Sequence, residues 1–80
     1  MLSLEVRTKL SESEAVNRIK NFFARGYGLE IKDESEGCVT LVGGGGYVRA
    51  NLCQEQGKTR IDFETREWEG QVKALAEDLG

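Results

Sequence analysis

Residues 38–53 read CVTLVGGGGYVRANLC, and this stretch decides the fold. Both halves alternate apolar with polar side chains and are rich in β-branched residues, and four glycines separate them. This pattern is typical of a β-hairpin, with strands over residues 38–42 and 47–53. Matching the apolar faces sets Val42 opposite Tyr47. In the same register, Leu41 faces Val48 and Val39 faces Ala50.

A further strand is predicted on the C-terminal side of this hairpin. Residues 54–58 read as a turn, and residues 59–65 form a strand with Ile61 and Phe63 pointing inward. After it, Thr65 is expected to cap a helix. Apolar residues at helical spacing form the inner face of that helix. They are Trp68, Val72, Leu75 and Leu79.

The N-terminal half supplies a strand, a helix and a second strand. Residues 2–9 alternate as a half-buried strand, and Ser11 with Glu14 fits the S-x-x-E capping box that begins a helix. Gly26 is expected to end this helix in a left-handed conformation. Residues 27–32 then form a strand with Tyr27, Leu29 and Ile31 on one face, followed by a polar turn over 33–37.

The chain is thus predicted to be one α+β domain, residues 1–80, with the order β-α-β-β-β-β-α. Short turns make the last four strands an antiparallel meander, and a right-handed crossover lets the first strand pair with the last. The expected sheet is five-stranded and antiparallel, in the order 1-5-4-3-2, with both helices on one face. The core residues are then expected to be Leu4, Val6, Val16, Ile19, Phe23, Leu29, Ile31, Val39, Leu41, Val48, Ala50, Leu52, Ile61, Phe63, Trp68, Val72 and Leu75.

This order of elements resembles one half of the TATA-binding-protein fold and a shortened helix-grip fold. The resemblance covers nearly the whole chain and rests on the element order. It implies that the open, concave face of the sheet binds DNA or another ligand. DNA-binding members insert phenylalanine pairs between bases. Here Phe63 is expected to point inward and Tyr47 is the only aromatic on the open face, so this sequence departs from that pattern.

Composition narrows the classes of function. The net charge of −3 does not favour nucleic acid or an anionic membrane. The sequence has no histidine, and its two cysteines, Cys38 and Cys53, do not follow a zinc pattern, so we expect no metal or cofactor. No window is apolar enough for a membrane span or a signal peptide, which predicts a cytoplasmic protein. No nucleophile is paired with a base, so an enzyme is not expected.

The face of the sheet that the helices leave open is the predicted site. Its side chains sum to +2, and Arg49 is expected to lie opposite Glu64. In the guessed register, Cys38 is opposite Lys32 and Cys53 is opposite Arg60. The candidate binding residues are Arg7, Lys32, Tyr47, Arg49, Asn51, Arg60 and Arg66.

Three interpretations of this surface stay open. It is a solvated face of neutralising charges, a platform for an anion or nucleic acid, or part of a subunit interface. The four glycines are expected to form a flexible hairpin tip, with a loop that closes over a ligand as the alternative. The leading hypothesis is a non-enzymatic binding or assembly module that forms a homodimer through its sheet. The alternative is nucleic-acid or anion binding on the open face.

Overall fold

The hairpin at residues 38–53 forms the middle of the sheet in the register predicted from its apolar faces. In the computed structural model, which describes all residues from Met1 to Gly80, β3 (Cys38–Gly43) pairs antiparallel with β4 (Gly46–Glu55). Val42 lies opposite Tyr47. Gly44 and Gly45 form the two-residue turn, both with positive φ.

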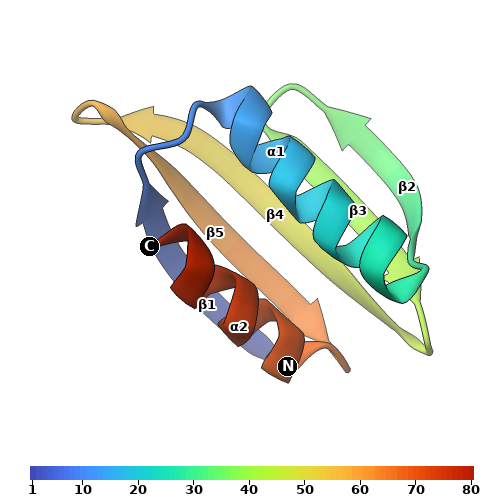
Figure 1. Cartoon of the computed structure of the whole chain (residues 1–80). Coiled ribbons are helices and arrows are strands. Elements are labelled where there is room, and N and C mark those ends of the chain that lie inside the picture. Colours follow the sequence, from blue (N-terminus) through green and yellow to red (C-terminus); the bar gives the residue numbers. More distant parts are fainter.

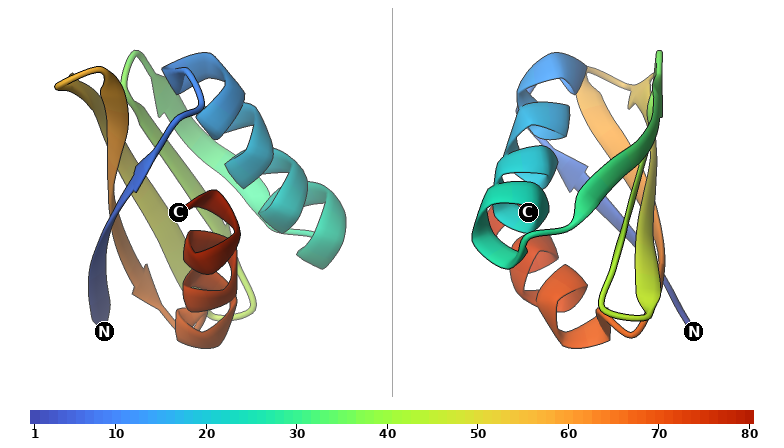
Figure 2. Two further views of the ribbon diagram at one scale, coloured as in Figure 1. Left: turned by 60° about the vertical axis from the view of Figure 1, so that its left-hand side comes forward. Right: turned by 90° about the vertical axis from the view of Figure 1, so that its right-hand side faces the viewer.

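The other elements complete the predicted architecture (Figure 1). They are β1 (Leu2–Thr8), α1 (Glu12–Lys20), the π-helical turn η1 (Asn21–Arg25), β2 (Glu30–Ser35), β5 (Lys58–Arg66) and α2 (Glu69–Leu79). The sheet is antiparallel throughout, in the order β1-β5-β4-β3-β2. Both helices cover the same face, and the other face is bare (Figure 2). The predicted fold class is confirmed.

The capping box at the start of α1 is confirmed, but the predicted left-handed conformation of Gly26 is wrong. The Glu14 backbone N–H donates to Ser11 Oγ at 3.2 Å, and the Ser11 N–H donates to Glu14 Oε1 at 3.0 Å. The Ser11 backbone N–H, and then its side chain, lower the pKa of the Glu14 carboxyl. At the other end, η1 extends the helix to Arg25 and Gly26 is the C-cap, but its φ of −76° is right-handed and the left-handed residue is Gly28.

Helix α2 begins later than predicted. Thr65 is buried within β5 and its hydroxyl donates to the Tyr47 carbonyl at 2.7 Å, so it is not a helix cap. The N-cap position is occupied by Trp68, which makes no side-chain cap. Trp68 instead donates its indole N–H to the Gly43 carbonyl at 2.9 Å, and this bond ties the glycine turn to the start of α2.

The core lies between the sheet and the two helices, largely as predicted. A single cluster of buried apolar residues runs from Ala15 and Ile19 of α1 across the inner face of the sheet to α2. Leu4, Val6, Val16 and Trp68 are only half-buried and pack against its edge. Ile31 was expected inside but is 45% exposed, because it lies on the edge strand β2, where the helices do not cover it.

Strand β2 departs from prediction in its bounds and in its register, and it contains a β-bulge. Ile31 pairs with Leu41 and Asp33 pairs with Thr40, so Lys32 is the extra residue. The bulge moves every later residue of β2 to the opposite face. The turn is also shorter than predicted, only Glu36 and Gly37, so β2 continues to Ser35. The short turn and the bulge together set Cys38 opposite Ser35, and the predicted pairing of Cys38 with Lys32 is wrong.

Candidate functional site

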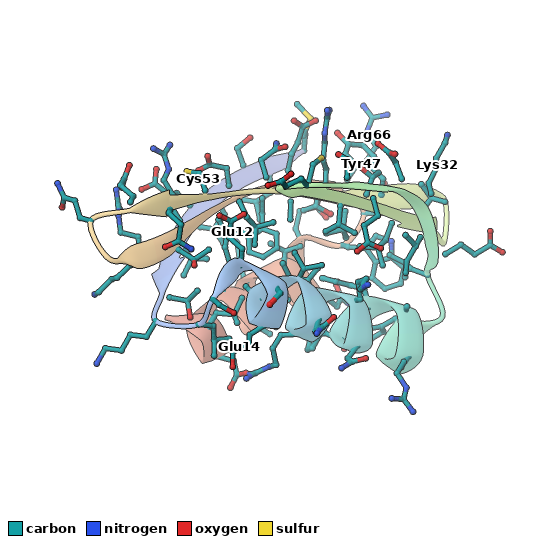
Figure 3. All side chains as sticks on the ribbon, turned by 90° about the horizontal axis from the view of Figure 1, so that it is seen from above. Glu12, Glu14, Lys32, Tyr47, Cys53 and Arg66 are labelled. Atoms are coloured by element: carbon teal, nitrogen blue, oxygen red, sulfur yellow. The ribbon has the colours of Figure 1, made fainter.

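The open face of the sheet carries all seven side chains predicted as a binding surface. Figure 3 shows Lys32, Tyr47 and Arg66 on the side of the sheet away from Glu14 and the helices. Strand pairing puts the others on the same face: Arg7 lies opposite Arg60, Arg49 opposite Glu64, and Asn51 opposite Asp62. The structure divides these residues into two groups with different partners.

The first group is an ion-pair network at the end of the face near the β4–β5 turn. Arg7 donates from Nε and Nη2 to Glu55 Oε1 at 3.0 and 2.6 Å, and from Nη1 to Glu5 Oε2 at 2.6 Å. Arg60 reaches Asp62, Glu5 and Glu55 at 3.2, 3.2 and 3.4 Å. Two arginines thus meet three carboxylates, and neither arginine is free to hold an anion.

Glu55 is the member of this network that sequence reasoning missed. Residues 54–58 read as a turn, whereas the turn is only Gln56 and Gly57, and β4 continues to Glu55. Alternation from Tyr47 along the longer strand would have placed Glu55 on the open face. Hydrogen bonding from Arg7, then from Arg60, lowers the pKa of the Glu55 carboxyl. The bond to Glu55 raises the pKa of the Arg7 guanidinium, and the bond to Asp62 is the main cause that raises the pKa of the Arg60 guanidinium.

The second group surrounds Tyr47. Its hydroxyl donates to Glu64 Oε2 at 2.6 Å, and this bond, with partial desolvation, raises the pKa of the phenol. Glu64 lies opposite Arg49, as predicted, but accepts from Tyr47 and makes no ion pair with that arginine. Arg49 and Arg66 both lack an ion pair and remain exposed.

The open face is not positively charged, contrary to the value of +2 expected from the sequence. The bulge brings Asp33 onto it, and the longer β4 adds Glu55. Lys9 lies beyond the end of β1. Lys58 lies opposite Glu55 at the start of β5. The face then holds six cations and six carboxylates, a net charge of 0: the cations are Arg7, Lys32, Arg49, Lys58, Arg60 and Arg66, and the carboxylates are Glu5, Glu30, Asp33, Glu55, Asp62 and Glu64.

The two edges of the sheet differ strongly. At one edge, all six residues of β2 are exposed, the bulge interrupts the strand, and the sequence EIKDES carries four charges. At the other edge, β1 pairs with β5 through all seven residues without a bulge. Bulges and charges protect a strand edge from further pairing, so β2 is protected and β1 is not.

A shallow apolar groove accompanies the free edge of β1. Its volume is about 350 Å³. It is lined by Leu4, Glu5 and Val6 of β1 and by Lys73, Ala76 and Glu77 of α2. Leu4 and Val6 face the helices but are only half-buried, because no strand or helix lies beyond them. The groove and the unpaired strand edge together form a continuous surface, called here the β1 edge.

The two cysteines do not form a disulfide with each other. Both lie on the open face, Cys38 opposite Asn51 and Cys53 opposite Arg60, the latter as predicted. Because Cys53 is two residues beyond the residue that faces Cys38, the pair is diagonal and too far apart for a disulfide. No three His, Cys, Asp or Glu side chains are grouped to hold a metal ion. No helix has the length and apolar character to span a membrane.

Comparison with protein-family models and with curated proteins gives no match to this chain.

Proposed function

We propose that this protein is a non-enzymatic assembly module that forms a symmetric homodimer by pairing β1 with β1 of a second copy. The observation that carries this proposal is the β1 edge: a straight, unbulged strand with no neighbour, beside half-buried apolar side chains. Adding a strand satisfies the unpaired backbone groups and covers Leu4 and Val6. A chain of 80 residues also has a small core, so burial at an interface adds a useful share of stability.

Charge complementarity selects one register for this pairing. In a two-fold antiparallel pair, the axis passes through a residue, since only then do side chains of the same face meet. An axis at Val6 sets Glu5 opposite the partner's Arg7, and the symmetry repeats the pair. An axis at Glu5 instead sets Glu5 against the partner's Glu5, which like charges disfavour.

Helix α2 supports the same arrangement. It runs alongside β1 in the same direction (Figure 1), so a two-fold axis that makes the strands antiparallel also brings the two α2 helices together antiparallel. Lys73 and Glu77 line the groove one helical turn apart, with Ala76 beside them. Antiparallel packing places Lys73 near the partner's Glu77, and the small Ala76 side chain permits close approach.

The dimer is tested by swapping charges on α2. Lys73→Glu sets two acidic side chains against each other across the interface, and Glu77→Lys sets two basic ones, so each single variant should weaken the dimer. The double variant K73E/E77K restores opposite charges and should dimerise again. Each close opposite-charge contact is expected to change the dissociation constant by about threefold to tenfold. Sedimentation velocity over a range of concentrations measures the effect.

The matched control changes a charge that lies outside the proposed interface. Glu36 is exposed in the β2–β3 turn, so Glu36→Lys changes charge as much as Glu77→Lys while leaving the interface intact. Its dissociation constant should equal that of the wild type. A chain that stays monomeric at every concentration, or a double variant weaker than both single variants, would rule out this dimer.

The alternative function, nucleic-acid or anion binding on the open face, stays a prediction. Arg49 and Arg66 support it because they flank Tyr47 and have no carboxylate partner. The lack of net positive charge on that face opposes it. The resemblance to one half of the TATA-binding-protein fold likewise remains a matter of element order.

A further inference from the structure

A hollow at the C-terminal end of α2 gathers basic side chains from four separate elements. It has a volume of about 330 Å³. Arg7 comes from the end of β1, Lys9 from the following loop, Arg18 from α1 and Lys58 from the start of β5. The only acidic side chain in the lining is Asp78.

Positive charge gathers at this hollow in an acidic protein, with four cations and one carboxylate in the lining. Asp78 neutralises Arg18, and Glu5 and Glu55 neutralise Arg7, so the uncompensated charge is the +2 of Lys9 and Lys58. Since the whole chain carries −3, all other side chains sum to −5. A cluster of one sign in a concave site raises the local concentration of small ions of the opposite sign.

The four cations play two different parts. Arg18 is fixed by an ion pair with Asp78, and Arg7 by its bonds to Glu55 and Glu5. Lys9 and Lys58 are exposed and make no ion pair. The arginines therefore form an ordered wall, and two ammonium groups with three donors each remain available to a ligand.

The end of helix α2 accounts for only a small part of this charge. Its last turn has no basic residue of its own, so nearby cations do offset the partial negative charge of its carbonyl groups. That partial charge is about half an elementary charge. The two positive charges of Lys9 and Lys58 exceed this partial charge, and the excess is left for a ligand.

We propose that this hollow binds a small phosphate-bearing anion, with Lys9 and Lys58 as its main ligands. A phosphate carries about two negative charges near neutral pH and three acceptor oxygens, which suits two lysines beside a positive wall. A long polyanion such as nucleic acid fits poorly, because it would extend over surroundings that sum to −5. The inference does not depend on the proposed dimer, since neither lysine belongs to the β1 edge.

The site is tested by titrating the ¹⁵N-labelled protein with inorganic phosphate at constant ionic strength, with sodium chloride as the balance. Saturable shifts are expected at the amides of Lys9, Lys58 and their neighbours. The double variant K9Q/K58Q should weaken binding about tenfold or more, the size expected for losing charge-assisted hydrogen bonds. A parallel titration with phenyl phosphate distinguishes a site for free phosphate, which excludes the ester, from one for phosphate esters.

The control variant removes the same total charge elsewhere. K32Q/R49Q takes two cations from the open face and should leave phosphate affinity within about twofold of the wild type. The proposal is overturned if both double variants weaken binding equally, since net charge would then explain it. It is also overturned if the shifts do not saturate, or if they gather around Tyr47 and Arg66, which would place the anion on the open face.

Discussion

At the scale of single residues, the glycine turn is a close-packed contact more than a flexible tip. Gly44 and Gly45 both have positive φ, 58° and 80°, as the tight turn requires. Only Gly44 also lies against another side chain. A Cβ atom on Gly44 would come within 2.9 Å of Trp68 Cζ2, whereas one on Gly45 would meet nothing within 4 Å. A side chain at Gly45 would therefore add backbone strain alone, whereas one at Gly44 would add backbone strain and a clash with Trp68.

This difference gives a matched pair of variants. Gly45→Ala should destabilise the protein by about 1–2 kcal/mol, the strain of placing an L residue in the left-handed region. Gly44→Ala should cost a further 1–3 kcal/mol or so, because Trp68 must also move. Urea denaturation of both variants measures the difference, and the indole fluorescence of Trp68 should shift only in Gly44→Ala. Equal losses would mean that the turn does not pack on Trp68.

Sequence reasoning succeeded for residues whose neighbours are close in the chain and failed where distant packing decides. Alternation around a two-residue turn fixed the pairing of Arg49 with Glu64, yet it did not show that Tyr47 takes the Glu64 carboxylate. The membership of the open face was therefore predictable, and its hydrogen bonds were not. The hydrogen-bond partner of a side chain depends on its rotamer and on which donors compete for it, and the alternation of residues along a strand gives no information on either.

At the scale of the elements, α1 and β2 show what local signals can and cannot determine. The capping box predicted the start of α1, because its bonds join residues three apart. Gly26 is the C-cap after η1, but it keeps a right-handed conformation and the left-handed turn falls two residues later, at Gly28. The bulge at Lys32 was also not predictable, since one inserted residue leaves no mark in the composition.

The cap on α1 should contribute measurably to stability. Ser11→Ala removes the acceptor of the Glu14 N–H and should cost about 1 kcal/mol, with a range of about 0.5–2. Asn17→Ala is the matched control: Asn17 is exposed on the same helix and its side chain makes no hydrogen bond, so this variant should be no less stable than the wild type. Thermal melts followed by circular dichroism compare the two variants. A loss as large in Asn17→Ala would show that the capping box contributes nothing.

At the scale of the whole molecule, the network around Glu55 joins three strands. Arg7 of β1, Glu55 of β4 and Arg60 of β5 meet at one end of the open face, and Glu5 of β1 also pairs with Arg60 there. Each pair is partly exposed, so the individual contributions are small and weaken with salt. Because Glu55 has a lowered pKa when folded, these contacts couple stability to pH.

Acid should therefore weaken the wild type more than a Glu55→Gln variant. A carboxyl whose pKa is lower in the folded protein stabilises the fold above its unfolded pKa, and this contribution disappears as pH falls through the folded pKa. Glu55→Gln lacks the contribution at every pH. Its stability deficit at about pH 7 should thus shrink to nothing by about pH 2 in urea titrations.

A matched substitution checks this pH dependence. Glu36 makes no ion pair and lies in an exposed turn, so Glu36→Gln should follow the wild-type pH profile. A deficit of Glu55→Gln that stays constant across the acid range would show that the carboxylate charge is not what stabilises the three strands.

The bulge at Lys32 has a consequence for how far association can go. Two copies joined at β1 would expose only their β2 strands at the two outer limits of the shared sheet, and each is interrupted and charged. A third copy would find no straight edge to join. The one inserted residue in β2 would therefore limit the proposed assembly to two copies and prevent its growth into a fibril.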